Sequence, residues 1–249
     1  MIRHLKQAIL FLEDPRALRA FVSWPTFSVT SYRMLQVLAR KGVRPKTVID
    51  VGANIGQFTV AATKTFHNIT VHAFEPLPDA AAKLRRRTAS LPGVTVHEVA
   101  LGDREATATL RVSRNSVSSS LLSMRPAHGE AFPESVTVEN IEVPVTTLDR
   151  ALGGIGLIHP VLLKIDAQGY EAHVLQGASA TLAQVALVLI ETSLVPLYEG
   201  EPIFPEWSAR FAEWGFVFDA AVGFLESPKT GEILQIDALF RRADTVEPA

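Results

Sequence analysis

The chain of 249 residues contains no cysteine, so disulfide bonds, zinc–thiolate sites and thiol nucleophiles are all excluded. It also lacks an excess of either charge, since 24 Lys and Arg residues against 26 Asp and Glu residues give a formal net charge of −2. A nucleic-acid-binding domain normally carries a clear basic bias. We therefore expect no nucleic acid partner, and any catalysis must come from oxygen and nitrogen groups.

Long apolar runs are missing near the N-terminus as well. The longest one there, Ala8–Leu12, has five residues and ends at Glu13 and Asp14. A signal-peptide core needs about 7–15 apolar residues and a membrane span about 20. We therefore expect no integral membrane segment and a cytoplasmic location. Packing of this stretch onto the domain is the favoured interpretation, with a peripheral membrane helix as the alternative.

Residues 1–45 have the pattern of a helical N-terminal extension. Asp14 followed by Pro15 is typical of an N-cap and a first-turn proline, and a second helix is predicted from a cap at Ser31 to a stop at Gly42. These helices are also candidates for a homo-oligomer contact.

From residue 46 onward, apolar strand patterns alternate with helical patterns. Strands are predicted at 47–51, 70–75, 94–100, 161–165 and 185–193, and helices from about 56, over 79–89 and over 204–214. Such alternation predicts right-handed crossovers and a parallel sheet. Two further strand patterns around the turn 227–231 indicate a terminal hairpin.

The expected fold is therefore α/β: a doubly wound, mostly parallel seven-stranded sheet that ends in an antiparallel hairpin. We assign 46–243 to one Rossmann-like domain and 244–249 to a tail. The segment 103–147 interrupts the alternation with two short β-like pieces around a serine-rich stretch. We expect it to be an insertion over one edge of the sheet.

The turn after the first strand, within "VIDVGANIGQF", indicates a ligand site. A dinucleotide-binding GxGxxG motif counted from Gly52 would need glycine at 54 and 57, where the sequence has Asn54 and Gln57. The diphosphate site is therefore missing. Glu75, which follows Gly52 by 23 residues, still has the spacing expected of a carboxylate that binds a ribose diol.

Asp50, Gly52 and Gly56 resemble the first motif of the class I S-adenosylmethionine-dependent methyltransferases, which has an acidic residue at the strand end followed by glycines. Six blocks then occur in an order that resembles the FkbM family of methyltransferases: "VIDVGANIGQFT", "HAFEP", "EVALGD", "SVSSSLL", "LLKIDAQGYEAHVLQGA" and "LVLIETS". They cover roughly residues 47–193, with Ala167 where the family usually has valine. The resemblance implies S-adenosylmethionine as the cofactor and methyl transfer to a hydroxyl of a small molecule, such as a sugar, a polyketide or another secondary metabolite.

The resemblance also implies a cofactor site. Gly52 would admit the methionyl part of the ligand, and Gly56 would let the helix start tight against the strand. Asp50 would accept hydrogen bonds from the ligand's ammonium group or from its waters. Either serine 119 or 120 of the insertion could donate to the cofactor or the substrate. The full predicted set is Asp50, Gly52, Asn54, Gly56, Glu75, Pro76, Ala100, Leu101, Ser119, Ser120 and Asp166.

The predicted catalytic residues are Lys164, Asp166 and Glu191. Alternation along a strand places Lys164 and Asp166 on one face, at the strand end where open α/β sheets bind ligands. Asp166 is the candidate general base, and the alternative is a carboxylate that caps the next helix or pairs with Lys164. Glu191 ends the neighbouring strand, where it could orient the acceptor or join a buried network.

Two other features receive weaker interpretations. Glu171 begins a helix and is either a site residue or a partner of the helix dipole. The carboxylates lack metal-ligand spacing, and so do the histidines at 72, 97 and 173, so no metal is predicted.

Two rival functions are an NAD-dependent oxidoreductase and a non-catalytic S-adenosylmethionine-binding module. Asn54, Gln57 and the terminal hairpin disfavour the first. The second does not explain why Asp50, Glu75 and Asp166 occur together.

Overall fold

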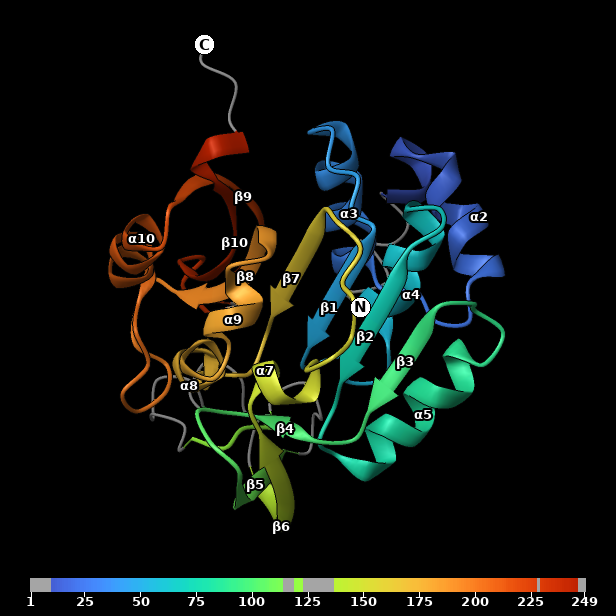
Figure 1. Ribbon diagram of the computed structural model, residues 1–249. Helices are drawn as coiled ribbons and strands as arrows, with labels where there is room; N and C mark the ends of the chain where they lie inside the picture. Colours follow the sequence, from blue (N-terminus) through green and yellow to red (C-terminus); the bar gives the residue numbers. More distant parts are fainter. Residues whose placement is uncertain (1–9, 114–118, 123–136, 228, 246–249) are drawn as a thin grey trace.

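A seven-stranded sheet forms the centre of the computed structural model (Figure 1), which describes residues 10–113, 119–122, 137–227 and 229–245. Its strands in spatial order are β3 (Val94–His97), β2 (Thr70–Phe74), β1 (Thr47–Val51), β7 (Val161–Ile165), β8 (Val185–Ser193), β10 (Ile233–Arg242) and β9 (Phe216–Glu226). The first five are parallel, and β10 is antiparallel to both of its neighbours. The predicted doubly wound sheet with a terminal hairpin is confirmed.

Helices cover both faces of this sheet, because nearly every residue of the central strands is buried and each face needs an apolar cover. One face carries α3 (Val29–Arg40), α4 (Gln57–Thr65) and α5 (Pro78–Thr88). The other carries α7 (Leu148–Ala151), α8 (Glu171–Gln176), α9 (Ser179–Leu182) and α10 (Phe204–Glu213). The predicted helices of the domain are thus confirmed to within a residue or two.

The N-terminal extension packs onto the domain. Helix α2 (Pro15–Ser23) is capped by Asp14 as predicted, and the same carboxylate accepts a 2.7 Å hydrogen bond from the Tyr32 hydroxyl of α3. The predicted start of α3 is wrong: Ser28 caps the helix by accepting from the Ser31 N–H, so Ser31 lies in the first turn. In the part of the chain that the structure describes, no helix is long and apolar enough to span a bilayer.

The insertion contributes β5 (Ala106–Ser113) and β6 (Thr137–Thr146) to a second, three-stranded sheet, in which β6 lies between β5 and the preceding β4 (Ala100–Leu101). The single strand predicted over 94–100 is wrong, because the chain leaves the main sheet after His97 and Ala100 pairs with Val145 of β6. The small sheet consequently lies beyond the carboxyl ends of the parallel strands, not over a sheet edge (Figure 1). Of the predicted tail 244–249, residues 244 and 245 belong to a short 3-10 helix, η3 (Ala243–Thr245), and the rest lies outside the described residues.

Strand register aligns a row of carboxylates across the main sheet. Val51 pairs with Phe74 and Ile165, and Ile165 pairs with Ile190, so the next residue of each strand falls in one row. Glu191 pairs with Asp237 of β10 and extends this row. We call its four acidic members the acid row: Glu75, Asp166, Glu191 and Asp237. Side chains alternate between faces along a strand, so the acid row shares the face that α3 and α4 cover.

We predict that Gly52→Ala destabilises the fold more than Gly42→Ala. Both glycines have a left-handed backbone, with φ of 72° and 78°, which costs any other residue about 1–2 kcal/mol. A Cβ on Gly42 meets no atom within 4 Å, whereas one on Gly52 would lie 1.8 Å from the Asp166 carbonyl oxygen. Steric crowding of this kind adds about 1–3 kcal/mol. Chemical denaturation measures both losses, and equal losses would contradict this explanation of Gly52.

Candidate active site

A cleft of about 350 Å³ lies at the carboxyl ends of β1 and β7, where the direction of sheet winding reverses. Most predicted site residues line it: Gly52, Asn54, Glu75, Pro76, Ala100, Leu101, Ser119, Ser120, Lys164, Asp166 and Glu191. Two predicted residues, Asp50 and Gly56, do not line it.

Asp50 lies below the cleft floor and is fully buried. One of its carboxylate oxygens, Oδ2, accepts a 2.6 Å hydrogen bond from Thr59, and the other, Oδ1, lies 3.3 Å from Lys164 Nζ. We expected this carboxylate to accept hydrogen bonds from the ligand, but its position leaves the side chain no direct route to the cleft. Its role is to hold Lys164.

Gly56 also acts from outside the cleft. Its φ of 91° favours glycine, and a Cβ there would lie 2.6 Å from Leu84 Cδ1 of α5. The tight start of α4 that we expected is present, but the close neighbour is α5 and not a strand.

Lys164 connects the first and fourth parallel strands in chain order, β1 and β7. Its Nζ lies 3.3 Å from Asp50 and 3.4 Å from Asp166, and it donates to the carbonyl oxygens of Val51 and Gly52 at 3.4 and 3.3 Å. Burial on its own lowers the pKa of Lys164, but Asp166 and Asp50 outweigh that effect and hold the pKa above its ordinary value. Lys164 is therefore a permanent cation and not a base.

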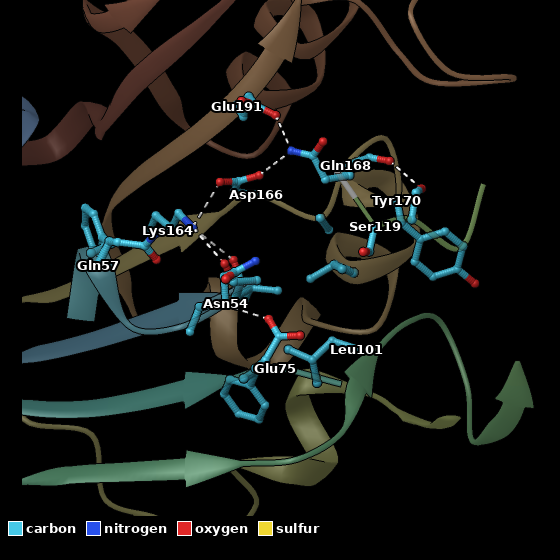
Figure 2. A pocket seen from close by; sticks show the side chains of 18 of the residues that line it. Asn54, Gln57, Glu75, Leu101, Ser119, Lys164, Asp166, Gln168, Tyr170 and Glu191 are labelled. Carbon is cyan, nitrogen blue, oxygen red and sulfur yellow. Dashed lines mark hydrogen bonds and ion pairs between the residues drawn. The ribbon is translucent and has the colours of Figure 1, made fainter. Parts of the chain in front are cut away.

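Gln168, which we did not predict from the sequence, links two of the predicted catalytic carboxylates. Its Nε2 donates to Asp166 Oδ1 at 2.7 Å and to Glu191 Oε2 at 2.9 Å, so Lys164, Asp166, Gln168 and Glu191 form one chain of contacts (Figure 2). Its Oε1 accepts a 2.7 Å hydrogen bond from the buried hydroxyl of Tyr198. These contacts fix the orientation of the amide.

The turn that carries Gln168 is held from two sides. Glu171 Oε1 accepts from the backbone N–H groups of Ala167 and Gly169 at 2.8 and 3.2 Å, so Glu171 supports the turn, and burial raises its pKa to about 7. From the insertion, Ser120 Oγ donates to the Gln168 carbonyl at 2.6 Å. Part of the predicted serine stretch, residues 116–118, lies outside the described residues.

Glu75 is the residue best placed to bind a ribose. Its Oε2 accepts from the Asn54 N–H at 2.7 Å and its Oε1 from the Leu77 N–H at 2.9 Å, which fixes the carboxylate at the cleft wall (Figure 2). Each oxygen retains a second lone pair that can accept a hydroxyl. Burial raises the pKa of Glu75 to about 7. Because apolar side chains at Leu101 and Tyr170 line the same cleft, these residues fit a nucleoside.

Several lining residues come from segments that gave no site signal in the sequence. Helix α3 contributes Ser31 and Met34, and its N-cap contributes Ser28, although the extension lies outside the blocks of the family resemblance. The terminal hairpin contributes Gln235 and Asp237. For Asp237 a signal was available, since a lone acid interrupts the apolar strand "LQIDALF".

The outer acids of the row are crowded by like charge. Burial, together with the charges of Asp166 and Asp237, raises the pKa of Glu191 well above its ordinary value. Burial and the charge of Asp166 raise the pKa of Asp237 to about 7. Within the described residues, no group of three or more acidic or histidine side chains is arranged to hold a metal ion.

The sheet order, the hairpin and the cleft position define a class I methyltransferase fold. The crystal structure of a "putative O-methyltransferase" from Klebsiella pneumoniae aligns with 86% of this chain and 80% of its own at a TM-score of 0.50 and 14% identity. The model of the Methyltransferase FkbM domain matches residues 50–218, so the chain belongs to the FkbM methyltransferase family. Its cofactor is S-adenosylmethionine, as predicted.

Two relatives illustrate the range of the family. The 2-O-methyltransferase NoeI of Sinorhizobium fredii is 28% identical over 210 residues, which is 80% of this chain and 84% of NoeI. The 31-O-demethyl-FK506 methyltransferase FkbM of Streptomyces tacrolimicus is 31% identical over 171 residues, 55% of this chain and 62% of that protein.

We predict that cofactor affinity depends on the ionisation of Glu75. A pKa of about 7 means that the carboxylate is protonated below pH 7 and ionised above it, and only the ionised form accepts a hydrogen bond at both oxygens from two hydroxyls. The Kd for S-adenosylmethionine should therefore be about tenfold higher at pH 6 than at pH 8. Calorimetry at both pH values measures this difference.

The matched variants are Glu75→Gln, which should bind more weakly and with little pH dependence, and Glu213→Gln, an exposed carboxylate on α10 that should behave like the parent. A pH dependence that persists in Glu75→Gln would assign the titration to another group.

Proposed function

We propose that this protein transfers the methyl group of S-adenosylmethionine to a hydroxyl oxygen of a small acceptor molecule. The observation that supports this most strongly is the Asp166–Gln168–Glu191 group at the carboxyl ends of β7 and β8, beside the residues suited to the cofactor. The relatives whose names specify O-methylation support the same reaction. The NAD-dependent alternative lacks the diphosphate-binding glycines, and a non-catalytic module would not need the acids beyond Glu75.

Glu75 would hold the ribose, Leu101 and Tyr170 the base, and the backbone around Gly52 the methionyl part. The bound cofactor supplies an electrophilic methyl group on sulfur. In-line displacement depends mainly on alignment of the nucleophile, so the protein must place the acceptor oxygen in the remaining part of the cleft, next to the acid row.

Asp166 is our candidate for the group that takes or orients the acceptor proton. Its side chain is 34% exposed, whereas Lys164 and Asp50 beneath it are buried. An aliphatic hydroxyl is a poor nucleophile while protonated, and an adjacent carboxylate can accept its proton. Lys164 and Gln168 fix the Asp166 carboxylate, and Glu191 shares the Gln168 amide and would orient the acceptor.

We predict that Asp166→Asn lowers kcat by about a hundredfold or more, in the range of general-base contributions. Asparagine keeps the size of the side chain but removes its charge and basicity. Although Asp166 belongs to the predicted cofactor set, Glu75 and the backbone around Gly52 would make the main cofactor contacts, so the Kd for S-adenosylmethionine should stay within a few fold of the parent value. Single-turnover kinetics and calorimetry measure the two quantities separately.

Glu213→Gln serves again as the carboxylate control outside the cleft. Near-parental turnover in Asp166→Asn would end this assignment, and the same measurement on Glu191→Gln would then decide whether Glu191 is the base.

Metal ions should not affect this reaction. Treatment with a chelator is expected to leave the rate unchanged, because no cluster of ligands lies among the described residues and a permanent cation, Lys164, already stands in the site. Loss of activity with a chelator and its return with magnesium would instead assign Asp166 and Glu191 as metal ligands.

The acceptor can be found by mass spectrometry, from the gain of one methyl group in a screen of hydroxylated sugars, polyketides and other secondary metabolites. Methylation at nitrogen or carbon, with hydroxyl compounds unchanged, would contradict the proposed function.

A further inference from the structure

The members of the acid row differ in their partners. Glu75 accepts backbone N–H groups, Asp166 contacts Lys164 and Gln168, and Glu191 accepts from Gln168 and Gln235. Asp237 lines the cleft, yet within the described residues no hydrogen bond or ion pair reaches its carboxylate. A partly buried acid without a donor carries a desolvation cost. A ligand in the cleft could supply the missing donor.

The neighbouring strand leaves room for this carboxylate. Asp237 pairs with Glu191 on one side and with Gly223 of β9 on the other. A Cβ on Gly223 would lie 2.2 Å from Asp237 Oδ2. The absence of a side chain at Gly223 therefore allows the carboxylate to occupy its position at the cleft wall.

Other residues that line the cleft suit a hydroxyl-rich ring. Ser28, Thr30 and Ser31 of the α3 segment bring hydroxyl groups to the lining, and Phe224 of β9 contributes an aromatic side chain that is 63% exposed. Hydroxyls and carboxylates bind hydroxyl groups, while an exposed aromatic face packs against apolar C–H surface. A sugar ring offers both kinds of surface.

The charge of the side chains that line the cleft disfavours anionic acceptors. Lys164 is the one basic side chain among the described residues that line the cleft, and Asp50 and Asp166 hold it. Above pH 7, where Asp237 with its pKa of about 7 is ionised, an anionic group on the acceptor would meet this carboxylate without a free cation to balance its charge. Contacts between like charges weaken the binding of unsuitable partners and so contribute to specificity.

We propose that the part of the cleft between β8, β10 and α3 is the acceptor subsite, that Asp237 binds an acceptor hydroxyl there, and that the acid row selects uncharged pyranose acceptors over anionic ones. This inference rests on the proposed methyl transfer to a hydroxyl. It makes Asp237 a specificity-determining residue, distinct from the group that takes the proton.

The test uses matched pairs of probes that differ only at carbon 6: the methyl pyranosides of glucose, galactose and mannose, each in equimolar competition with its uronate. Mass spectrometry of the methylated products gives the ratio of neutral to anionic product. At pH 8, where Asp237 is ionised, the parent protein should favour the neutral partner by on the order of a hundredfold. Equal methylation of the two partners, or preference for the uronate, would overturn the inference.

Two variants test Asp237 by different routes. Asp237→Asn removes the charge and should lower the ratio of neutral to anionic product about tenfold. Gly223→Ala keeps the charge but displaces the carboxylate, so it should raise the KM of the neutral pyranoside. Both should bind S-adenosylmethionine like the parent, which also reports that they fold. Glu226→Gln, on the same hairpin but outside the cleft, should change neither quantity. An unchanged ratio in Asp237→Asn would remove this residue from the subsite.

Failure of this inference can be told from failure of the proposed function. If no pyranoside or uronate is methylated but the broad screen finds another methylated hydroxyl, the proposed function stands and the inference is wrong. If no hydroxyl compound in either set is methylated, both are wrong.

Discussion

The Lys164 cation and its carboxylate partners hold the active site together. Lys164 projects from an otherwise apolar strand, contacts a fully buried Asp50 below and the cleft carboxylate Asp166 above, and donates to two carbonyl groups at the end of β1. A buried carboxylate left without its cation costs a protein about 3–5 kcal/mol. One side chain thus ties the end of β1 to β7 and holds the acid that would face the acceptor. Asp50 and Asp166 balance the charge of Lys164, so Glu75, Glu191 and Asp237 give the cleft an acidic character.

Strand register explains why those acids meet. Glu75, Asp166 and Glu191 each follow the same row of apolar residues, and Asp237 of β10 pairs with Glu191, so four separate strands bring these acids together. Because the row faces the α3 and α4 side of the sheet, the N-terminal extension forms part of the cleft. The extension therefore contributes to the site as well as to the fold. Ser31 of α3, for example, is buried and lines the cleft.

Much of this fold could be predicted from the sequence, because its strands are short apolar runs with clear breaks and its hairpin has a turn signal. The break between His97 and Ala100 could not, since "VTVHEVA" alternates like one strand and only pairing with the distant β6 separates its end. For the site, Glu75, Lys164 and Asp166 were predictable as charges at strand ends. Asp50 was predicted to accept hydrogen bonds from the ligand, yet its side chain lies buried and does not line the cleft, because sequence does not reveal the depth at which a side chain lies. Gln168 gave no signal, since its role depends on a turn with a positive φ that brings its amide between two carboxylates.

We infer that the cofactor's ribose and the acceptor's hydroxyl lie side by side along the acid row. A crystal structure with S-adenosylhomocysteine and a methylated product tests it most directly. The account predicts both ribose hydroxyls within about 2.6–3.2 Å of the Glu75 carboxylate, and the product's methoxy oxygen at a similar distance from Asp166 or Glu191. A cofactor that avoids Glu75, or a methoxy group that lies away from the acid row, would contradict it.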